Sequence, residues 1–241
     1  MTLRTRFAAL AVAVCLSHPA ALWAQDADPH RDLVDALAAR ARLLDNYGPS
    51  AVSTMLDEAR RDPEMVEMEG ECPGTLDIMG QAAMPTLVKS QERAVDQYRT
   101  ALLDLFAGKL SPEIARSAAD FYRSADGRFI IDIAEQNQSD THSLEDVRRN
   151  EDMSISREAM EADKLAMREA LRASEHMERI ETIGQHLAGS QWFAPFATLR
   201  PDMHTLELAL QNDDFTQAEE AEFDRALESA LSAHLDKCYA E

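Results

Sequence analysis

Apolar residues recur at three- and four-residue intervals along most of the chain, which is the spacing of one face of an α-helix. The longest such lines lie in residues 75–107 and 157–187, and Gly189-Ser190 ends the second. The first line is expected to face the core of a bundle and has one polar member, Gln91; its other members are Met84, Val88, Val95, Tyr98, Leu102 and Leu105. No segment alternates strictly between apolar and polar residues for long, as a half-buried strand would. We therefore predict an all-α protein, a helical bundle of about eight helices.

Shorter amphipathic stretches predict further helices, separated by residues that favour turns. Asn46-Tyr47-Gly48-Pro49 closes the first stretch, and the Pro and Gly residues within 62–74 predict a loop. Thr216 to Glu219 has the sequence of a capping box, which predicts the start of the last helix. The predicted short helices cover residues 33–44, 50–60, 112–122, 129–134, 144–150 and 216–238.

Five segments follow from these patterns. The predicted boundaries give a signal peptide (1–24), N-terminal helices and a loop (25–74), a helical domain (75–135), an acidic connector (136–156) and a C-terminal helical half packed on the first (157–241). Both halves read as a long helix, a Gly break, an aromatic-rich corner and another helix. Two degenerate helical-hairpin halves from a duplication are one interpretation, and unrelated halves are the other, because the residue-level correspondence is weak.

The first 24 residues have the layout of a secretory signal peptide. Arg4 and Arg6 precede an apolar run over residues 7–16, and small residues lead to a predicted cut after Ala24. The run is about half of the roughly 20 residues that a membrane span needs. We therefore expect export to the periplasm and no membrane span after cleavage.

The chain is strongly acidic, with 44 Asp and Glu against 24 Lys and Arg, a net charge of −20. Nucleic-acid binding requires a basic surface, so we predict no nucleic-acid partner. Anionic lipid headgroups are disfavoured for the same reason. The charge permits a basic partner or cations, although acidity that only keeps the protein in solution is the simpler interpretation.

Two cysteines, Cys72 and Cys238, remain after the predicted cleavage. An even number of cysteines in an oxidising compartment favours a disulfide between them. Two separate thiols, one of them buried, are the alternative. No Cys-x-x-Cys pair supports a thioredoxin-like redox role.

The stretch FYRSADGRF, residues 121–129, predicts a structural corner between two helices. Ser124 suits an N-cap, Asp126 lies where the helix dipole favours a carboxylate, and Gly127 gives clearance to a neighbouring backbone. Phe121 and Tyr122 are expected to cover the corner. A hydrolase could instead combine Ser124 and Asp126 with a distant histidine, which leaves His142, His176 and His204 as alternatives. The Gly-x-Ser-x-Gly elbow is missing, so we predict no catalytic residue here.

Residues 102–132 resemble an uncharacterised family of exported bacterial helical proteins, the domain of unknown function 2059. The matching positions are Phe106, Ser111, Glu113, Phe121, Tyr122, Ser124 and Gly127. Ala125 departs from the family pattern, which has proline there, and alanine leaves the corner less rigid. The resemblance implies a helical fold and export, and it carries no assigned activity.

No cofactor or metal site is predicted, because the chain has no His-x3-His, His-Glu-x-x-His or Cys/His cluster. Methionines at helical spacing indicate core packing, or else a groove for apolar peptides. Core packing is the simpler interpretation of Trp192, Phe193 and Phe196 as well, and they are also the candidates for a partner contact, with Trp192, beside a Gly-Ser break, as the best candidate for a partly exposed one. We expect a non-enzymatic envelope protein that binds an unidentified envelope protein or peptide through helix faces. An envelope hydrolase, and a structural or stress-related accessory without a small ligand, are the alternatives.

Overall fold

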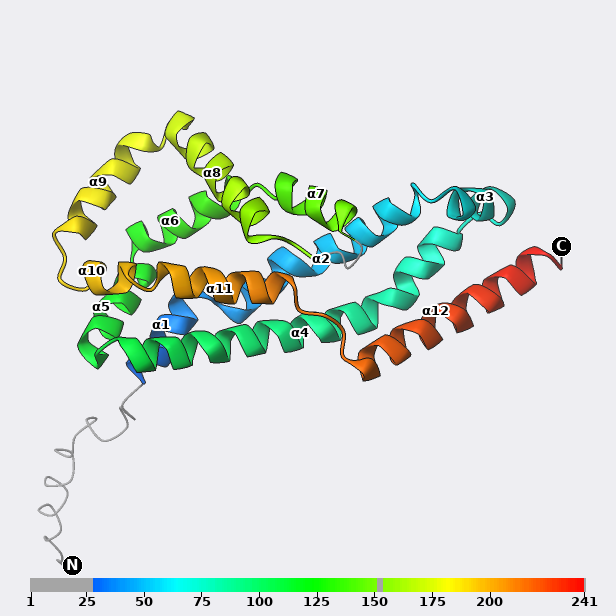
Figure 1. Ribbon diagram of the computed structural model, residues 1–241, viewed down its shortest axis with the longest axis horizontal. Helices are drawn as coiled ribbons and strands as arrows, with labels where there is room; N and C mark the ends of the chain where they lie inside the picture. Colours follow the sequence, from blue (N-terminus) through cyan, green and yellow to red (C-terminus); the bar gives the residue numbers. More distant parts are fainter. Residues whose placement is uncertain (1–27, 151–153, 241) are drawn as a thin grey trace, which may run out of the picture.

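The computed structural model describes residues 28–150 and 154–240, and this part consists of twelve helices and their connections, with no strand (Figure 1). The all-α prediction is confirmed. The predicted signal peptide lies outside the described residues. In chain order the helices are α1 (Pro29–Leu37), α2 (Arg40–Ala59), α3 (Pro63–Glu71), α4 (Thr75–Lys109), α5 (Pro112–Arg123), α6 (Ala125–Gln136), α7 (Thr141–Arg149), α8 (Arg157–Ala173), α9 (Met177–Ala188), α10 (Phe193–Ala197), α11 (Arg200–Gln211) and α12 (Gln217–Cys238).

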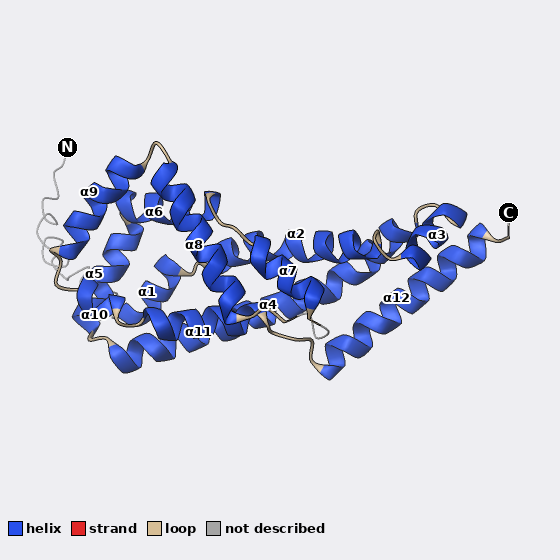
Figure 2. Cartoon of the chain, turned by 45° about the horizontal axis from the view of Figure 1, so that its top comes forward, coloured by secondary structure: helices blue, strands red, loops and turns tan. Residues whose placement is uncertain are grey.

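The molecule is elongated, and α4 runs along most of its length (Figures 1 and 2). The main core lies at the C-terminal end of α4, where α1, α5 and α10 meet it. Leu33, Leu102, Phe106 and Ala118 are completely buried there. We call this end the head. The other members of the core are Val34, Ala38, Leu110, Ala115, Ala119, Trp192, Phe196 and Leu199.

The opposite end of α4 is flanked by α2 and α12, and we call this part the arm. Arg40 at the start of α2 bonds to Asp96, while Leu56 near its end contacts Gly80, so α2 is antiparallel to α4. On α12, Glu219 bonds to Arg93 and the helix ends beside residue 72, so α12 is also antiparallel to α4. Both flanking helices therefore depend on α4 for most of their contacts.

The break between the first two helices lies earlier than predicted. The chain turns at Ala38-Ala39, and α2 then continues through residues 46–49. Arg42 and Arg99 donate to the carbonyl oxygens of Leu37 and Ala38, which α1 leaves without helical partners. These bonds stabilise the earlier break.

Residues 63–71 form α3, and the predicted loop over 62–74 is wrong. The Asp62 carboxylate accepts from Glu64 N at 2.9 Å, Pro63 occupies the first turn and Glu64 adds an acid there. This is a complete helix start, with the cap, proline and acid in the expected order. The neighbouring glycines and prolines concealed it.

The second long helix is broken, which corrects the prediction over 157–187. At Ser174 the backbone turns to ψ 156°, and the Ser174 hydroxyl donates to Leu171 O at 2.7 Å and accepts from His176 N at 3.3 Å. The second half therefore begins with helices of 17 and 12 residues, against the unbroken 35 residues of α4. The two halves therefore do not share the outline on which the interpretation as a duplication depended, and residues 28–150 and 154–240 contain twelve helices rather than about eight.

The predicted apolar line of α4 is buried only in its second part. Val95 is 1% exposed, whereas Met84 and Val88 are each 41% exposed. In the arm the buried side of α4 carries smaller residues instead, with Ala83 and Thr86 almost fully covered. The buried side changes because α2 and α12 cover a different side of α4 from the side that faces the core in the head.

Candidate functional site

Ser124 ends one helix and begins the next. Its amide donates to Phe121 O at 2.9 Å, and its hydroxyl accepts from Gly127 N at 3.1 Å. The residue closes α5 and is the N-cap of α6, and Ala125 occupies the first helical position, where proline would also fit. The predicted capping role of Ser124 is therefore observed in atomic detail.

Gly127 leaves no room for a side chain. A Cβ atom at this position would lie 2.0 Å from Phe121 O and 2.5 Å from the Cα of Tyr122. Both of these atoms belong to the backbone of α5, so the neighbour cannot move aside as a flexible side chain would. The absence of a side chain lets α6 cross the end of α5 at this distance.

Asp126, in the first turn of α6, also makes an ion pair with another helix. Its carboxylate pairs with the guanidinium of Arg179 on α9 at 3.0 Å. Arg179 also lies over the ring of Phe129, 3.9 Å from its centroid, and the His176 ring packs edge-on to the Phe129 ring with 5.6 Å between centroids. The corner is thereby joined to α9.

Phe121 and Tyr122 pack against the aromatic cluster after α9. Trp192 lies 5.4 Å from the Phe121 ring and Phe196 lies 5.8 Å from the Tyr122 ring, between centroids. Burial raises the pKa of the Tyr122 phenol to about 12. The corner is thus part of the core of the head.

This packing changes the interpretation of the predicted partner contact. Trp192 is 8% exposed and Phe196 is 6% exposed, because α5 and α10 cover both rings, while Phe193 is half-buried at the edge. The expected contact surface is not available at Trp192 or Phe196. Their role in this structure is core packing.

The groups considered for hydrolysis are engaged elsewhere. The Ser124 hydroxyl accepts a hydrogen bond from Gly127 N, and the Asp126 carboxylate accepts one from Arg179. Nδ1 of His204 lies 3.0 Å from the Glu161 carboxylate. Among the described residues, no hydrogen bond joins a histidine to Ser124. Within the same residues, no three His, Cys, Asp or Glu side chains gather where they could hold a metal ion.

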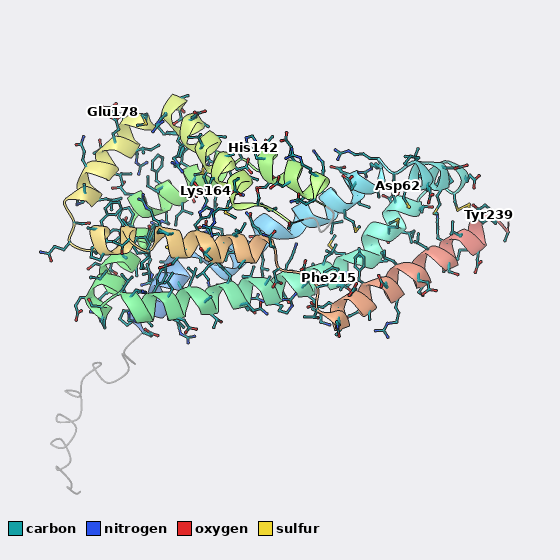
Figure 3. The ribbon with its side chains drawn as sticks, in the orientation of Figure 1. Asp62, His142, Lys164, Glu178, Phe215 and Tyr239 are labelled. Atoms are coloured by element: carbon teal, nitrogen blue, oxygen red, sulfur yellow. A yellow bond between two sulfur atoms is a disulfide. The ribbon has the colours of Figure 1, made fainter. Side chains whose placement is uncertain are left out.

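Cys72 and Cys238 form a disulfide, with 5.8 Å between their Cα atoms. The predicted bridge is confirmed, and it ties the end of α12 to the turn between α3 and α4. Tyr239 follows it and donates from its hydroxyl to Glu71 Oε2 at 3.0 Å. Figure 3 labels Tyr239 at the end of the molecule farthest from the head.

An ion-pair network, which sequence reasoning missed, joins the start of α12 to α4. Arg93 contacts Glu219 at 3.0 Å and Asp213 at 2.6 Å, and donates to Asp214 O at 2.8 Å. The bond from Arg93, with bonds from Thr216, lowers the pKa of Glu219 to about 2. The capping box was the available signal for Glu219, whereas nothing local indicated Arg93.

Asp163 is a second residue without a sequence signal. Its carboxylate is almost buried and accepts from His142 N and Ser143 N, each at 2.9 Å, and from the Ser143 hydroxyl at 2.7 Å. Burial alone raises the pKa of Asp163, but these bonds outweigh it and lower the pKa. Its role is to cap α7 from α8.

No protein-family model, curated protein or solved structure matches the chain. The family resemblance therefore stays a prediction. None of the described helices combines the length and the apolar character that crossing a membrane requires.

Proposed function

We propose that the chain is an exported, non-enzymatic envelope protein that holds a partner protein or peptide through a helix face. We also propose a distant relationship to the domain of unknown function 2059. The family proposal is supported by the geometry at Ser124 and Gly127, because both motif positions have a structural reason there. Export is supported by the Cys72–Cys238 disulfide, since such bonds persist in oxidising compartments.

The exposed part of the α4 apolar line carries the binding proposal. Met84 and Val88 continue the line of Val95 and Leu102, yet each is 41% exposed while those two are buried. Exposed apolar side chains that form a continuous surface, unlike single ones, mark interaction sites. Asp77 is exposed on the same helix, and the chain carries a net charge of −20. An apolar segment flanked by basic residues suits this face.

Site-specific photo-crosslinking tests the binding proposal. A photoreactive phenylalanine analogue at Val88 is expected to join the protein to a discrete envelope partner, and the same analogue at Ser229 of α12 is not. Both positions are exposed. With the analogue at Met84 instead, Val88→Glu is expected to abolish partner crosslinking without changing the melting temperature, while Ser229→Glu leaves crosslinking intact. Equal amounts of crosslinked product from both positions contradict the proposal. The absence of a crosslinked product at Val88 favours the alternative of a structural or stress-related accessory protein without a ligand.

Export is tested separately. The expected mature N-terminus is Gln25, so N-terminal sequencing of the protein from the periplasmic fraction should begin there. A protein that retains Met1 and stays in the cytoplasmic fraction would contradict export, whatever its binding properties.

A further inference from the structure

Two attachments of different kinds hold α12. At its start, Glu219 is buried and bonded to Arg93, and Lys89 pairs with Glu222 at 2.6 Å. At its end, the bridge to Cys72 makes the attachment covalent. Every residue of α12 is described, and Glu219 is the only one that is buried.

The middle and end of α12 contain no fully buried side chain. The side chains on its inner side are half-buried: Phe223, Leu227, Ala230, His234 and Cys238. Half-buried residues remove less apolar surface from water than core residues do, so each contributes less to holding the helix. The last turns of α12 are therefore held mainly by the disulfide, beside the hydrogen bond from Tyr239 to Glu71, whose two side chains are exposed to water.

The other side of the bridge is held by hydrogen bonds that do not involve α12, although the His234 ring of α12 lies beside Gly74. The Glu69 carboxylate accepts from Gly74 N and Leu76 N, each at 2.9 Å, and these bonds cap the start of α4. The Thr75 hydroxyl donates to Cys72 O at 2.7 Å, and Gly74 makes the turn with a φ of 95°, a conformation that favours glycine. When the bridge opens, the turn between α3 and α4 keeps its bonds.

The two sulfur atoms differ in access. Cys72 is completely buried, whereas Cys238 is half-buried in the last turn of α12 and is followed by Tyr239, which is 65% exposed. Thiol–disulfide exchange requires a thiolate to reach one sulfur along the bond axis. Cys238 is the sulfur that an external reductant reaches, and Cys72 is the leaving group.

We propose that the Cys72–Cys238 bridge is a redox-operated latch on α12, opened by a dithiol reductant. A thiolate of the dithiol attacks Sγ of Cys238, the sulfur–sulfur bond breaks, and Cys72 leaves as a thiolate that takes up a proton. The second thiolate attacks the dithiol's own sulfur in the mixed disulfide and releases Cys238 as a thiol. The dithiol gives up two electrons and ends as a disulfide, and the two cysteines accept them.

Opening the latch frees the last turns of α12 and leaves its start attached. Arg93 and Glu219 lie at the opposite end of α12 from the bridge, so reduction does not disturb them. The side of α4 that those turns cover then becomes exposed. The oxidised and reduced proteins thus present different surfaces on the arm, while the core of the head stays the same.

Hydrogen exchange of the mature chain, residues 25–241, with and without dithiothreitol tests the latch. Reduction is expected to speed exchange about ten-fold or more at residues 226–240, with changes of less than about two-fold at 217–223 and in α5. Cys238→Ser should reproduce the reduced pattern without reductant, and dithiothreitol should not change it further. Full protection of α12 after reduction overturns the proposal, and so does loss of protection throughout the head.

Trapping tests which sulfur is attacked. A thioredoxin-type dithiol protein that lacks its second cysteine is expected to stay bound through Cys238, identified by peptide mapping. An adduct at Cys72 overturns the assigned direction. With Arg93→Gln, reduction is expected to speed exchange at 217–223 as well, because the start of α12 then keeps the exposed Lys89–Glu222 pair but loses the buried bond to Glu219. Unchanged protection there contradicts the role of Arg93 as the second attachment.

Discussion

Asp146 and Asp163 each bond to the start of the helix that carries the other. Asp163 on α8 accepts from Ser143 in the first turn of α7, and Asp146 on α7 accepts from the amide of Ser156, the N-cap of α8, at 2.9 Å. Hydrogen bonds from the Ser156 side chain and amide lower the pKa of Asp146. Neither helix has its complete set of bonds at the start without the other, so we expect α7 and α8 to form together.

Replacing Asp163 tests this pairing. Asp163→Ala is expected to lower the free energy of unfolding by about 2–3 kcal/mol, because it leaves amides of α7 without partners in a buried place. Asp163→Asn keeps one acceptor oxygen and should cost about half as much. Glu169→Ala, an exposed change on the same helix, is the control and should stay within about 0.5 kcal/mol. Urea unfolding measures all three, and equal values for Asp163→Ala and Glu169→Ala would contradict the capping role.

The two glycines Gly127 and Gly184 give a matched comparison. Gly127→Ala is expected to lower stability by about 3 kcal/mol or to prevent folding, because its Cβ would lie 2.0 Å from Phe121 O. Gly184 lies inside α9 with no atom within 4 Å of an added Cβ, so Gly184→Ala should raise stability by about 0.5–1 kcal/mol. Thermal unfolding followed by circular dichroism measures both. A Gly127→Ala protein as stable as the wild type would refute the close approach.

The cap at Ser124 separates a structural role from a chemical one. Ser124→Ala should lower the free energy of unfolding by about 1 kcal/mol, and Ser124→Asp should restore most of it, because aspartate caps as well as serine does. Ser232→Ala on the exposed side of α12 is the control and should be neutral or slightly stabilising. If Ala and Asp at position 124 destabilise equally, the capping interpretation is wrong.

The ion pair of the buried Glu219 carboxylate with Arg93 predicts how stability depends on pH. Its pKa in the folded chain is about 2, below the ordinary 4.5, so its contribution is complete above about 4.5 and is lost as pH falls toward about 2. Glu219→Gln should cost about 2 kcal/mol at neutral pH, as expected for a bond to a charged group. The difference between wild type and variant should shrink through that pH window. Melting curves across it, with the disulfide intact, make the comparison, and a constant difference would show that ionisation of Glu219 is not involved.

Local chemistry was predictable from the sequence, and contacts between distant segments were not. The starts at Ser124 and Thr216 were predicted because a cap involves residues only three positions apart. The same rule applies at Asp62, but the Pro and Gly residues around it led to the prediction of a loop over 62–74. Pairs such as Asp126 with Arg179, 53 positions apart, have no periodic signal. The disulfide was an exception, because only two cysteines follow the predicted cleavage site.

Burial was the least predictable property. Trp192 was the candidate for a partly exposed contact because it follows a helix end, yet its ring lies 5.4 Å from that of Phe121, a residue 71 positions earlier. Val88 was expected in a buried line, yet the arm covers a different side of α4. Periodicity shows which residues share a helix face, and the neighbouring helices decide whether that face is covered.

The bridge between Cys72 and Cys238 also bears on cleavage by proteases. It joins positions 166 residues apart, so a single cut anywhere between them leaves two fragments connected by sulfur. In an oxidising compartment such a cut adds one water molecule and leaves the two fragments covalently connected. The fragments part only when a reductant is present.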